Sequence, residues 1–199
     1  LRGPDTMQKM DRGISSQGSW TVDGVLTVVF PTATCLLTAL MAFGARAISP
    51  ASPAFQLPVN GFLVGAFAFA SRRWKLPGLV AAVLLLTVGM LGFAPGASAQ
   101  IAIHTIVLMI ALAGTVFVNM ERFARCSRPS FLQTFLAWAA VTTVFYFLAG
   151  VVLLLLFRAT EAGPYLRLYA RLSITLGLGL GLGFALRDRL APVVCRGAT

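Results

Sequence analysis

The chain has 199 residues, of which 58% are hydrophobic and only 11% are charged, and its net charge is +10. Soluble domains carry about 25% charged residues, so a chain this apolar cannot cover itself with a water-compatible surface at this size. The composition therefore excludes an ordinary soluble domain. Nucleic-acid binding is also disfavoured, because the basic residues flank apolar segments instead of forming a basic stripe.

The amino-terminal part of the chain predicts a tail followed by three spans. Residues 1–22 are polar and predict a cytoplasmic tail, and the first apolar stretches cover 24–44, 54–70 and 76–93. The second stretch is short, because about 16 residues of helix reach roughly 24 Å, less than a hydrocarbon core of about 30 Å. It is the weakest of the predicted spans.

The remaining apolar stretches complete the predicted architecture. They cover 101–120, 131–157 and 172–186, and stretches of this kind are typical of transmembrane helices. We therefore predict an all-α, polytopic membrane protein with six transmembrane helices in a domain over 23–190. A short cytoplasmic tail, 191–199, follows this domain.

The basic residues alternate between the gaps, and this pattern predicts the orientation. If the amino terminus is cytoplasmic, the twelve Lys and Arg residues on that side are Arg2, Lys9, Arg12, Arg72, Arg73, Lys75, Arg122, Arg125, Arg128, Arg187, Arg189 and Arg196. The four on the opposite side are Arg46, Arg158, Arg167 and Arg171. Because Lys and Arg favour cytoplasmic loops, both termini are expected inside. A bacterial inner membrane is the simplest location, and an organelle inner membrane is the alternative.

Glycines alternate with leucines in the sixth predicted span, at Gly177, Gly179, Gly181 and Gly183. On a helix, Gly177 and Gly181 share one face while Gly179 and Gly183 share roughly the opposite one, so each pair lets a neighbouring helix approach closely. We expect a helix-packing interface inside the bundle. Contact with another subunit and a flexible gate are the alternatives.

His104 is the only histidine and lies near the start of the fourth predicted span. An ionisable residue inside a membrane is a candidate for function. It could be the axial ligand of a haem or chlorophyll-type pigment, or it could relay a proton. We favour a neutral imidazole hydrogen-bonded to a neighbouring helix, and no residue pattern specifies a cofactor.

Other polar residues lie within or at the ends of the predicted spans, namely Gln56, Asn60, Asn119, Gln133 and Thr134. Gln56 and Asn60 are one turn apart and could line a substrate path, although hydrogen bonds between helices are the simpler use. On the outer side, Arg167 and Arg171 are expected to anchor the chain at the interface, in contact with lipid headgroups or an anion.

The sequence offers no pattern for catalysis or for metal binding. No acidic residue lies within a predicted span, since Asp23 and Glu121 are at span ends, and the three cysteines have no paired spacing. His104 has no acid nearby, so neither a catalytic set nor a metal cluster can be assembled. We therefore predict that the protein is not an enzyme.

Three hypotheses for function follow. The first is a non-catalytic integral subunit of a larger membrane complex, which contacts lipids, pigments or other membrane subunits and scaffolds their assembly. The second is a small channel or transporter for a neutral or anionic solute, and the third is cofactor binding through His104. A transporter predicts a midplane cavity lined by Gln56, Asn60 and threonines, whereas a scaffold predicts no continuous polar cavity.

Overall fold

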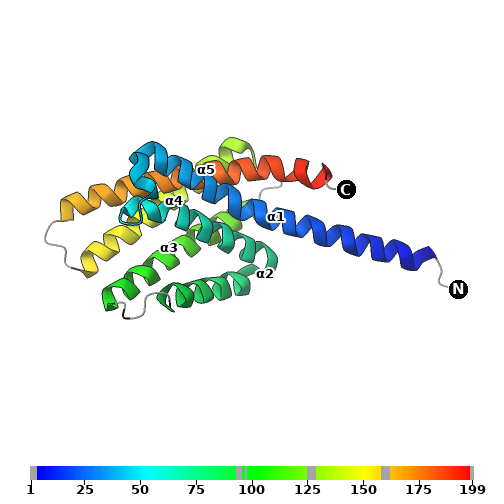
Figure 1. Ribbon diagram of the computed structural model, residues 1–199, viewed down its shortest axis with the longest axis horizontal. Helices are drawn as coiled ribbons and strands as arrows, with labels where there is room; N and C mark the ends of the chain where they lie inside the picture. Colours follow the sequence, from blue (N-terminus) through cyan, green and yellow to red (C-terminus); the bar gives the residue numbers. More distant parts are fainter. Residues whose placement is uncertain (1–3, 93–95, 97, 125–128, 158–161, 198–199) are drawn as a thin grey trace.

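A computed structural model describes residues 4–92, 96, 98–124, 129–157 and 162–197, and it is helical with no strand among them. The long helices are α1 (Pro4–Phe43), α2 (Gln56–Gly92), α3 (Ala99–Ala124), α4 (Phe131–Leu156) and α5 (Ala162–Gly197), and two short 3₁₀ helices, η1 (Gly44–Ile48) and η2 (Pro53–Phe55), join α1 to α2 (Figure 1). The predicted all-α fold is confirmed. Within the described part of the chain, five helices are long and apolar enough to cross a membrane, whereas the sequence predicts six spans.

Helix α2 accounts for this difference. It covers most of the second and third predicted spans and is interrupted only at Lys75, whose φ of 56° and ψ of −147° are not helical. Pro77 follows two residues later, and its ring disfavours a helical conformation at the residue before it and clashes with the preceding turn. Figure 1 shows that α2 changes direction sharply within its length, so that its second part runs back along the bundle.

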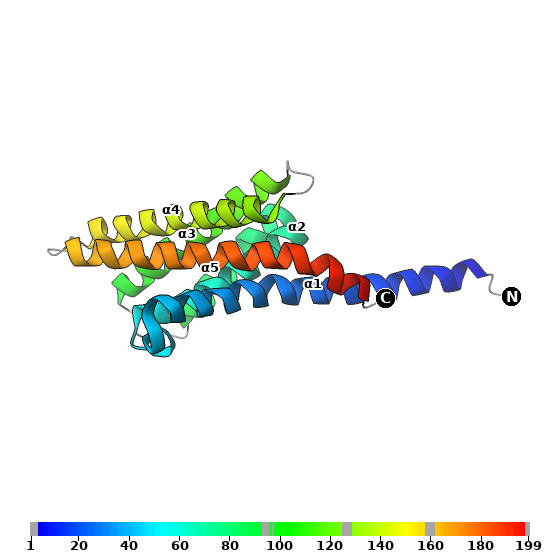
Figure 2. The ribbon, with the colours of Figure 1, turned by 90° about the horizontal axis from the view of Figure 1, so that it is seen from above.

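Helix α1 begins well before the first predicted span. It starts at Pro4, in a first-turn position that tolerates proline, and continues without interruption to Phe43. Its first part extends away from the other helices (Figures 1 and 2). Most of the predicted tail over 1–22 is therefore part of this helix, while residues 1–3 lie outside the described part.

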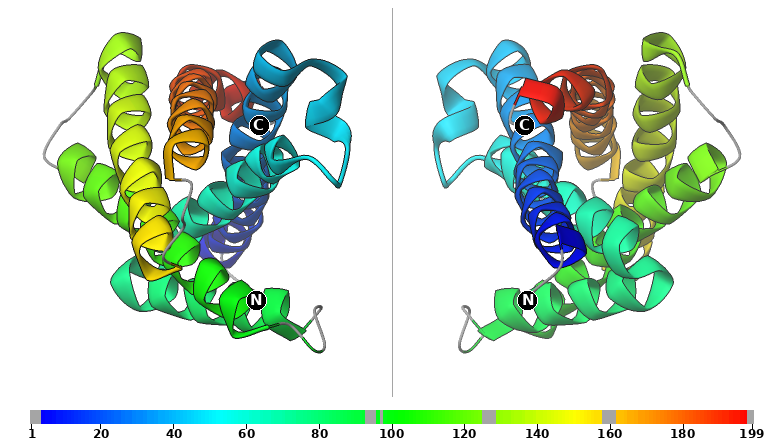
Figure 3. Two further views of the ribbon diagram at one scale, coloured as in Figure 1. Left: turned by 90° about the vertical axis from the view of Figure 1, so that its left-hand side faces the viewer. Right: turned by 90° about the vertical axis from the view of Figure 1, so that its right-hand side faces the viewer.

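Helix α5 occupies the middle of the bundle, where it packs between α1 and α4 (Figures 2 and 3). Gly177 and Gly181 face α4, where Ala139 lies against both, whereas Gly179 and Gly183 face α1. Both glycine faces are thus filled by helices of the same chain. The absence of side chains lets the backbones come close, which is the geometry that four-residue glycine spacing allows.

Hydrogen bonds reinforce the contact between α1 and α5. The hydroxyl of Thr34 donates to the carbonyl oxygen of Gly179 at 2.7 Å, and that of Thr38 donates to the carbonyl oxygen of Thr175 at 3.2 Å. Such bonds need short distances between the helix backbones, which the glycines provide. This side of the bundle is therefore closed by close packing.

The outward faces of the helices carry large apolar side chains. Met41, Leu85 and Leu155 are 80%, 74% and 73% exposed. A soluble protein rarely exposes such contiguous apolar surface, whereas lipid tails cover it without cost. The surface agrees with a multi-pass membrane protein.

Candidate functional site

Three residues that the sequence singles out for different reasons lie in one cavity. Gln56, Asn60 and His104 line a space of about 580 Å³, here called the large cavity. The described residues that line it are Phe55, Gln56, Val59, Asn60, Met90, Gln100, Ile101, His104, Thr105, Leu108, Met109 and Phe157. The large cavity lies at the end of the bundle where α2 and α3 begin, and this end is here called the cavity end. The transporter hypothesis predicts a cavity at the middle of the bundle instead.

The positions of these side chains follow from helix geometry. Gln56 begins α2 and Asn60 lies one turn later, so both point to the same side. Gln100 and His104 have the same spacing at the start of α3. The hydroxyl of the next residue, Thr105, donates to a backbone carbonyl within α3 at 2.9 Å. The polar groups of two helices therefore converge at one place.

The chemistry of the large cavity suits a small, uncharged molecule. Among the described residues of the lining, most are apolar, the polar side chains are amides, an imidazole and a hydroxyl, and none is Asp, Glu, Lys or Arg. Binding sites for small molecules are typically apolar spaces of about 300–1,000 Å³ with a few polar groups that orient the ligand. An ion would find no opposite charge to compensate for its lost hydration.

One lining residue of the large cavity, Asn60, makes a buried hydrogen bond that joins α2 to α4. The side-chain amide of Asn60 donates to the hydroxyl oxygen of Tyr146 at 3.1 Å, and the two residues are only 1% and 2% exposed. Tyr146 is not among the residues that sequence patterns single out. The available signal was that it is the one tyrosine of the chain inside a predicted span, where a buried hydroxyl needs a partner.

His104 is half-buried on the cavity wall. No group of three or more His, Cys, Asp and Glu side chains that could hold a metal ion occurs in the described part of the chain. A cofactor bound at His104 would be ligated by this imidazole, and the side-chain amides that line the large cavity would lie beside the cofactor. The cofactor hypothesis stays a prediction.

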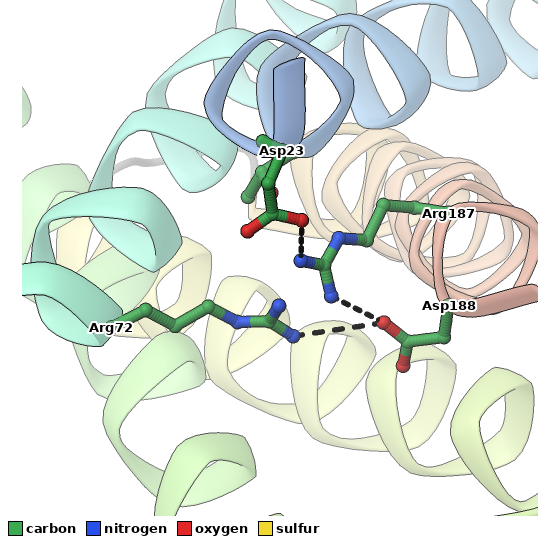
Figure 4. A network of polar contacts seen from close by, with 5 residues as sticks. Asp23, Arg72, Arg187 and Asp188 are labelled. Atoms are coloured by element: carbon green, nitrogen blue, oxygen red, sulfur yellow. Dashed lines mark hydrogen bonds and ion pairs between the residues drawn. The ribbon is translucent and has the colours of Figure 1, made fainter. Parts of the chain in front are cut away.

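The opposite end of the bundle holds four charged side chains, here called the charged cluster (Figure 4). Arg187 of α5, whose side chain is 7% exposed, donates to the carboxylates of Asp23 on α1 and Asp188. A guanidinium nitrogen of Arg72 on α2 lies 3.6 Å from the same carboxylate oxygen of Asp188. Two positive and two negative charges balance, which reduces the cost of removing them from water. The charged cluster thereby ties α1, α2 and α5 together.

Sequence reasoning missed this cluster because it treated its members separately. Asp23 was noted only as an acidic residue at the end of a span, and Arg72 and Arg187 only as charges that set orientation. The signal was the co-occurrence of Asp23 with the Arg187-Asp188 pair at the ends of two spans. The ion pair between Asp23 and Arg187 can be recognised only when the structure shows that the ends of these two spans meet.

The two arginines of the predicted lipid or anion contact have different surroundings. The guanidinium of Arg171 donates to the carbonyl oxygen of Ala42 and lies 4.5 Å from the centre of the Phe43 ring. It therefore joins the start of α5 to the end of α1 at the cavity end. Arg167 lies one turn away and is exposed.

Comparison with known proteins adds no name to this site. No protein-family model, no curated protein and no solved structure matches the chain.

Proposed function

We propose that the chain crosses the membrane six times, with α2 forming two spans. The charged cluster brings Asp23, near the start of the apolar part of α1, beside Arg187, near the end of that of α5. A chain that starts and ends on one side of a membrane crosses it an even number of times. Five uninterrupted helices would give an odd number, so one helix has to turn back.

Helix α2 is the one that can do so. It is interrupted at Lys75, and Arg72 beside the interruption belongs to the same charged cluster. At 1.5 Å per residue, 56–74 and 76–92 reach about 28 Å and 26 Å, close to the thickness of a hydrocarbon core. The excess of basic residues then puts the charged cluster on the cytoplasmic side and the cavity end outside, as in a bacterial inner membrane.

Thiol labelling on the two sides of the membrane tests this topology. In a cysteine-free variant, Ser49→Cys and Ser98→Cys should both react with a membrane-impermeant maleimide added from outside. Both positions are exposed in the structure and lie before and after α2. Labelling of these two positions from opposite sides would show that α2 crosses only once and would refute six spans.

For the function itself, we propose a passive pathway for small, uncharged solutes, with the large cavity as its outer mouth. The observation that carries this proposal is the convergence of Gln56, Asn60 and His104 on one cavity whose described lining residues carry no charged side chain. Passive movement is favoured because ion-coupled transporters usually need a buried carboxylate, and the acidic residues of this sequence lie outside the middle of every span.

Volume changes of proteoliposomes measure this activity. Stopped-flow light scattering under a glycerol gradient should show faster equilibration than protein-free liposomes show. Thr105→Trp should reduce the excess rate several-fold, because an indole fills much of the cavity. Thr87→Trp is the matched control, since Thr87 also donates to a backbone carbonyl one turn earlier but does not line the cavity. No excess rate, or an equal loss in both variants, would refute the proposal.

A second candidate is the non-catalytic subunit of a larger membrane complex. The first part of α1 favours it, because this helix extends beyond the bundle (Figure 2), where a partner could cover it. Gentle purification, followed by identification of co-purifying proteins and an absorption spectrum, separates the candidates. A stoichiometric membrane partner would support the subunit, and an absorption band lost on His104→Ala would support cofactor binding.

A further inference from the structure

Most of the buried polar atoms without a partner belong to two helices. Among the described residues, Asn119 Oδ1, Thr134 Oγ1, Thr142 Oγ1 and Arg187 Nε are buried and have no hydrogen-bond partner. The first three lie on α3 and α4. Buried polar groups in native proteins are nearly always hydrogen-bonded, so such atoms point to a ligand such as water.

Two of these atoms, Thr134 Oγ1 and Thr142 Oγ1, belong to one continuous face of α4. Thr134, Trp138, Thr142 and Tyr146 follow one another at four-residue intervals, so they share a face, and each is at most 2% exposed. The glycine contacts with α5 lie beside this face, where Thr143 lies against Gly177. Trp138 of the polar face stacks on Phe184 of α5, with ring centroids 3.7 Å apart, so this face also borders α5.

Helix α3 also carries two buried polar residues. Thr115 and Asn119 lie one turn apart and are 1% and 0% exposed, and the amide nitrogen of Asn119 donates to the carbonyl oxygen of Thr115 at 2.9 Å. The neighbours of α3 are α2 and α4. The buried polar groups of α3 and α4 thus lie in the half of the bundle that also contains the large cavity.

Cavities lie at both ends of this half. Beyond the large cavity and the Asn60–Tyr146 bond, a second space of about 410 Å³, here called the small cavity, lies toward the other end of α3. Its lining is Ser71, Lys75, Leu76, Phe117, Met120 and Glu121. Asn119 lies in the same turn of α3 as Phe117 and Met120, although it is not itself among the lining residues of the small cavity.

We propose that the polar groups of α3 and α4 form a closed passage between the two cavities, and that the Asn60–Tyr146 hydrogen bond is its gate. This inference rests on the proposed function and adds a route and a barrier to it. The passage carries water and small uncharged solutes, because Asn60, Tyr146, Thr142, Thr115 and Asn119 supply hydrogen bonds but no charge. The α1–α5 contact cannot form such a passage, because its glycines bring the two helix backbones into close contact.

Thiol reactivity at two adjacent positions tests the passage. A maleimide reacts with the thiolate, which forms only where water reaches the thiol. Thr142→Cys is compared with Thr143→Cys, which lies at the same depth but faces α5, using N-methylmaleimide on the protein in liposomes. Cys126 and Cys195 are replaced by serine, and the parent that retains only the fully buried Cys35 sets the background rate.

We expect Thr142→Cys to react at least tenfold faster than Thr143→Cys. Adding Tyr146→Phe, which removes the acceptor of the Asn60 bond, should raise the Thr142→Cys rate about tenfold again and leave Thr143→Cys unchanged. Asn60→Ala breaks the same bond from the other side and should have the same effect. It provides a second variant if Tyr146→Phe folds poorly.

The possible outcomes separate the passage from the proposed function. Equal, slow rates at the two positions, with or without Tyr146→Phe, would overturn the passage. An equal acceleration at both would also overturn it, because it would indicate general loosening. Thr105→Cys, on the wall of the large cavity, should react quickly in either case. If it does not, the cavity is not open to water and the proposed function itself fails.

Discussion

The close contact between α1 and α5 predicts a large effect of one methyl group at Gly183. A Cβ at this position would lie 2.6 Å from Thr34 Oγ1 and 2.7 Å and 2.9 Å from the Cα and N atoms of Pro31. Ordinary contacts between such atoms are about 3.5–4 Å. The Pro31 atoms are backbone and cannot rotate away, so Gly183→Ala has to push the two helices apart.

Two effects of Gly183→Ala lower the free energy of unfolding, and one effect raises it. Overpacking of a close contact costs about 1–3 kcal/mol, and loss of the neighbouring Thr34–Gly179 hydrogen bond adds about 1 kcal/mol. Alanine favours a helix over glycine by up to about 1 kcal/mol, which offsets part of this. We expect Gly183→Ala to lower the free energy of unfolding by about 2 kcal/mol.

The matched control is Gly89→Ala in α2. A Cβ at Gly89 would meet nothing within 4 Å, so this variant keeps only the helix-propensity gain and should be neutral or slightly stabilised. The measurement is reversible unfolding in mixed detergent micelles, followed by circular dichroism, for the two variants and the parent. Equal stability of the two variants would show that the α1–α5 contact is not as close as described.

Three further predictions concern other contacts. Arg187→Met should lower the free energy of unfolding by about 2–3 kcal/mol. This is less than the loss of a fully buried charge pair costs, because the Asp23 and Asp188 side chains are 29% and 30% exposed. Arg189→Met, at an exposed position, should change the free energy of unfolding little, and equal losses in the two variants would refute the role of the charged cluster. Cys35 is fully buried, so its thiol should resist maleimide until the protein unfolds, and rapid labelling of the native protein would contradict the packing. Ser130→Ala removes the capping box at the start of α4 and should cost about 1 kcal/mol in the same unfolding experiment, whereas no change would show that this cap contributes nothing.

Much of the architecture could be predicted from the sequence because a membrane imposes simple rules. Apolar stretches long enough to cross lipid have to be helical, since the backbone finds no hydrogen-bond partner in hydrocarbon. The alternation of Gly177, Gly179, Gly181 and Gly183 likewise dictates two opposite faces without side chains, whatever helices they meet. These properties depend on residues close together in the chain.

The candidate site required the tertiary structure, because its members come from distant segments. Gln56 and His104 were suspected separately, for a substrate path and for a cofactor, and only the arrangement of α2 beside α3 places them in one cavity. Tyr146 gains its importance from Asn60, its partner 86 positions away in the sequence. No local pattern could reveal that hydrogen bond.

Composition and local patterns are enough to predict that this protein is helical, is apolar enough for lipid and carries most of its positive charge in alternate gaps. The packing of the helices could not be predicted in this way: glycines let α5 lie close to α1 and α4, whereas cavities and buried polar groups lie in the part of the bundle that contains α3. The difference comes from the range of the interactions involved. Helix formation and transfer into lipid are additive over neighbouring residues, whereas a cavity or a buried charge pair depends on which distant surfaces come into contact.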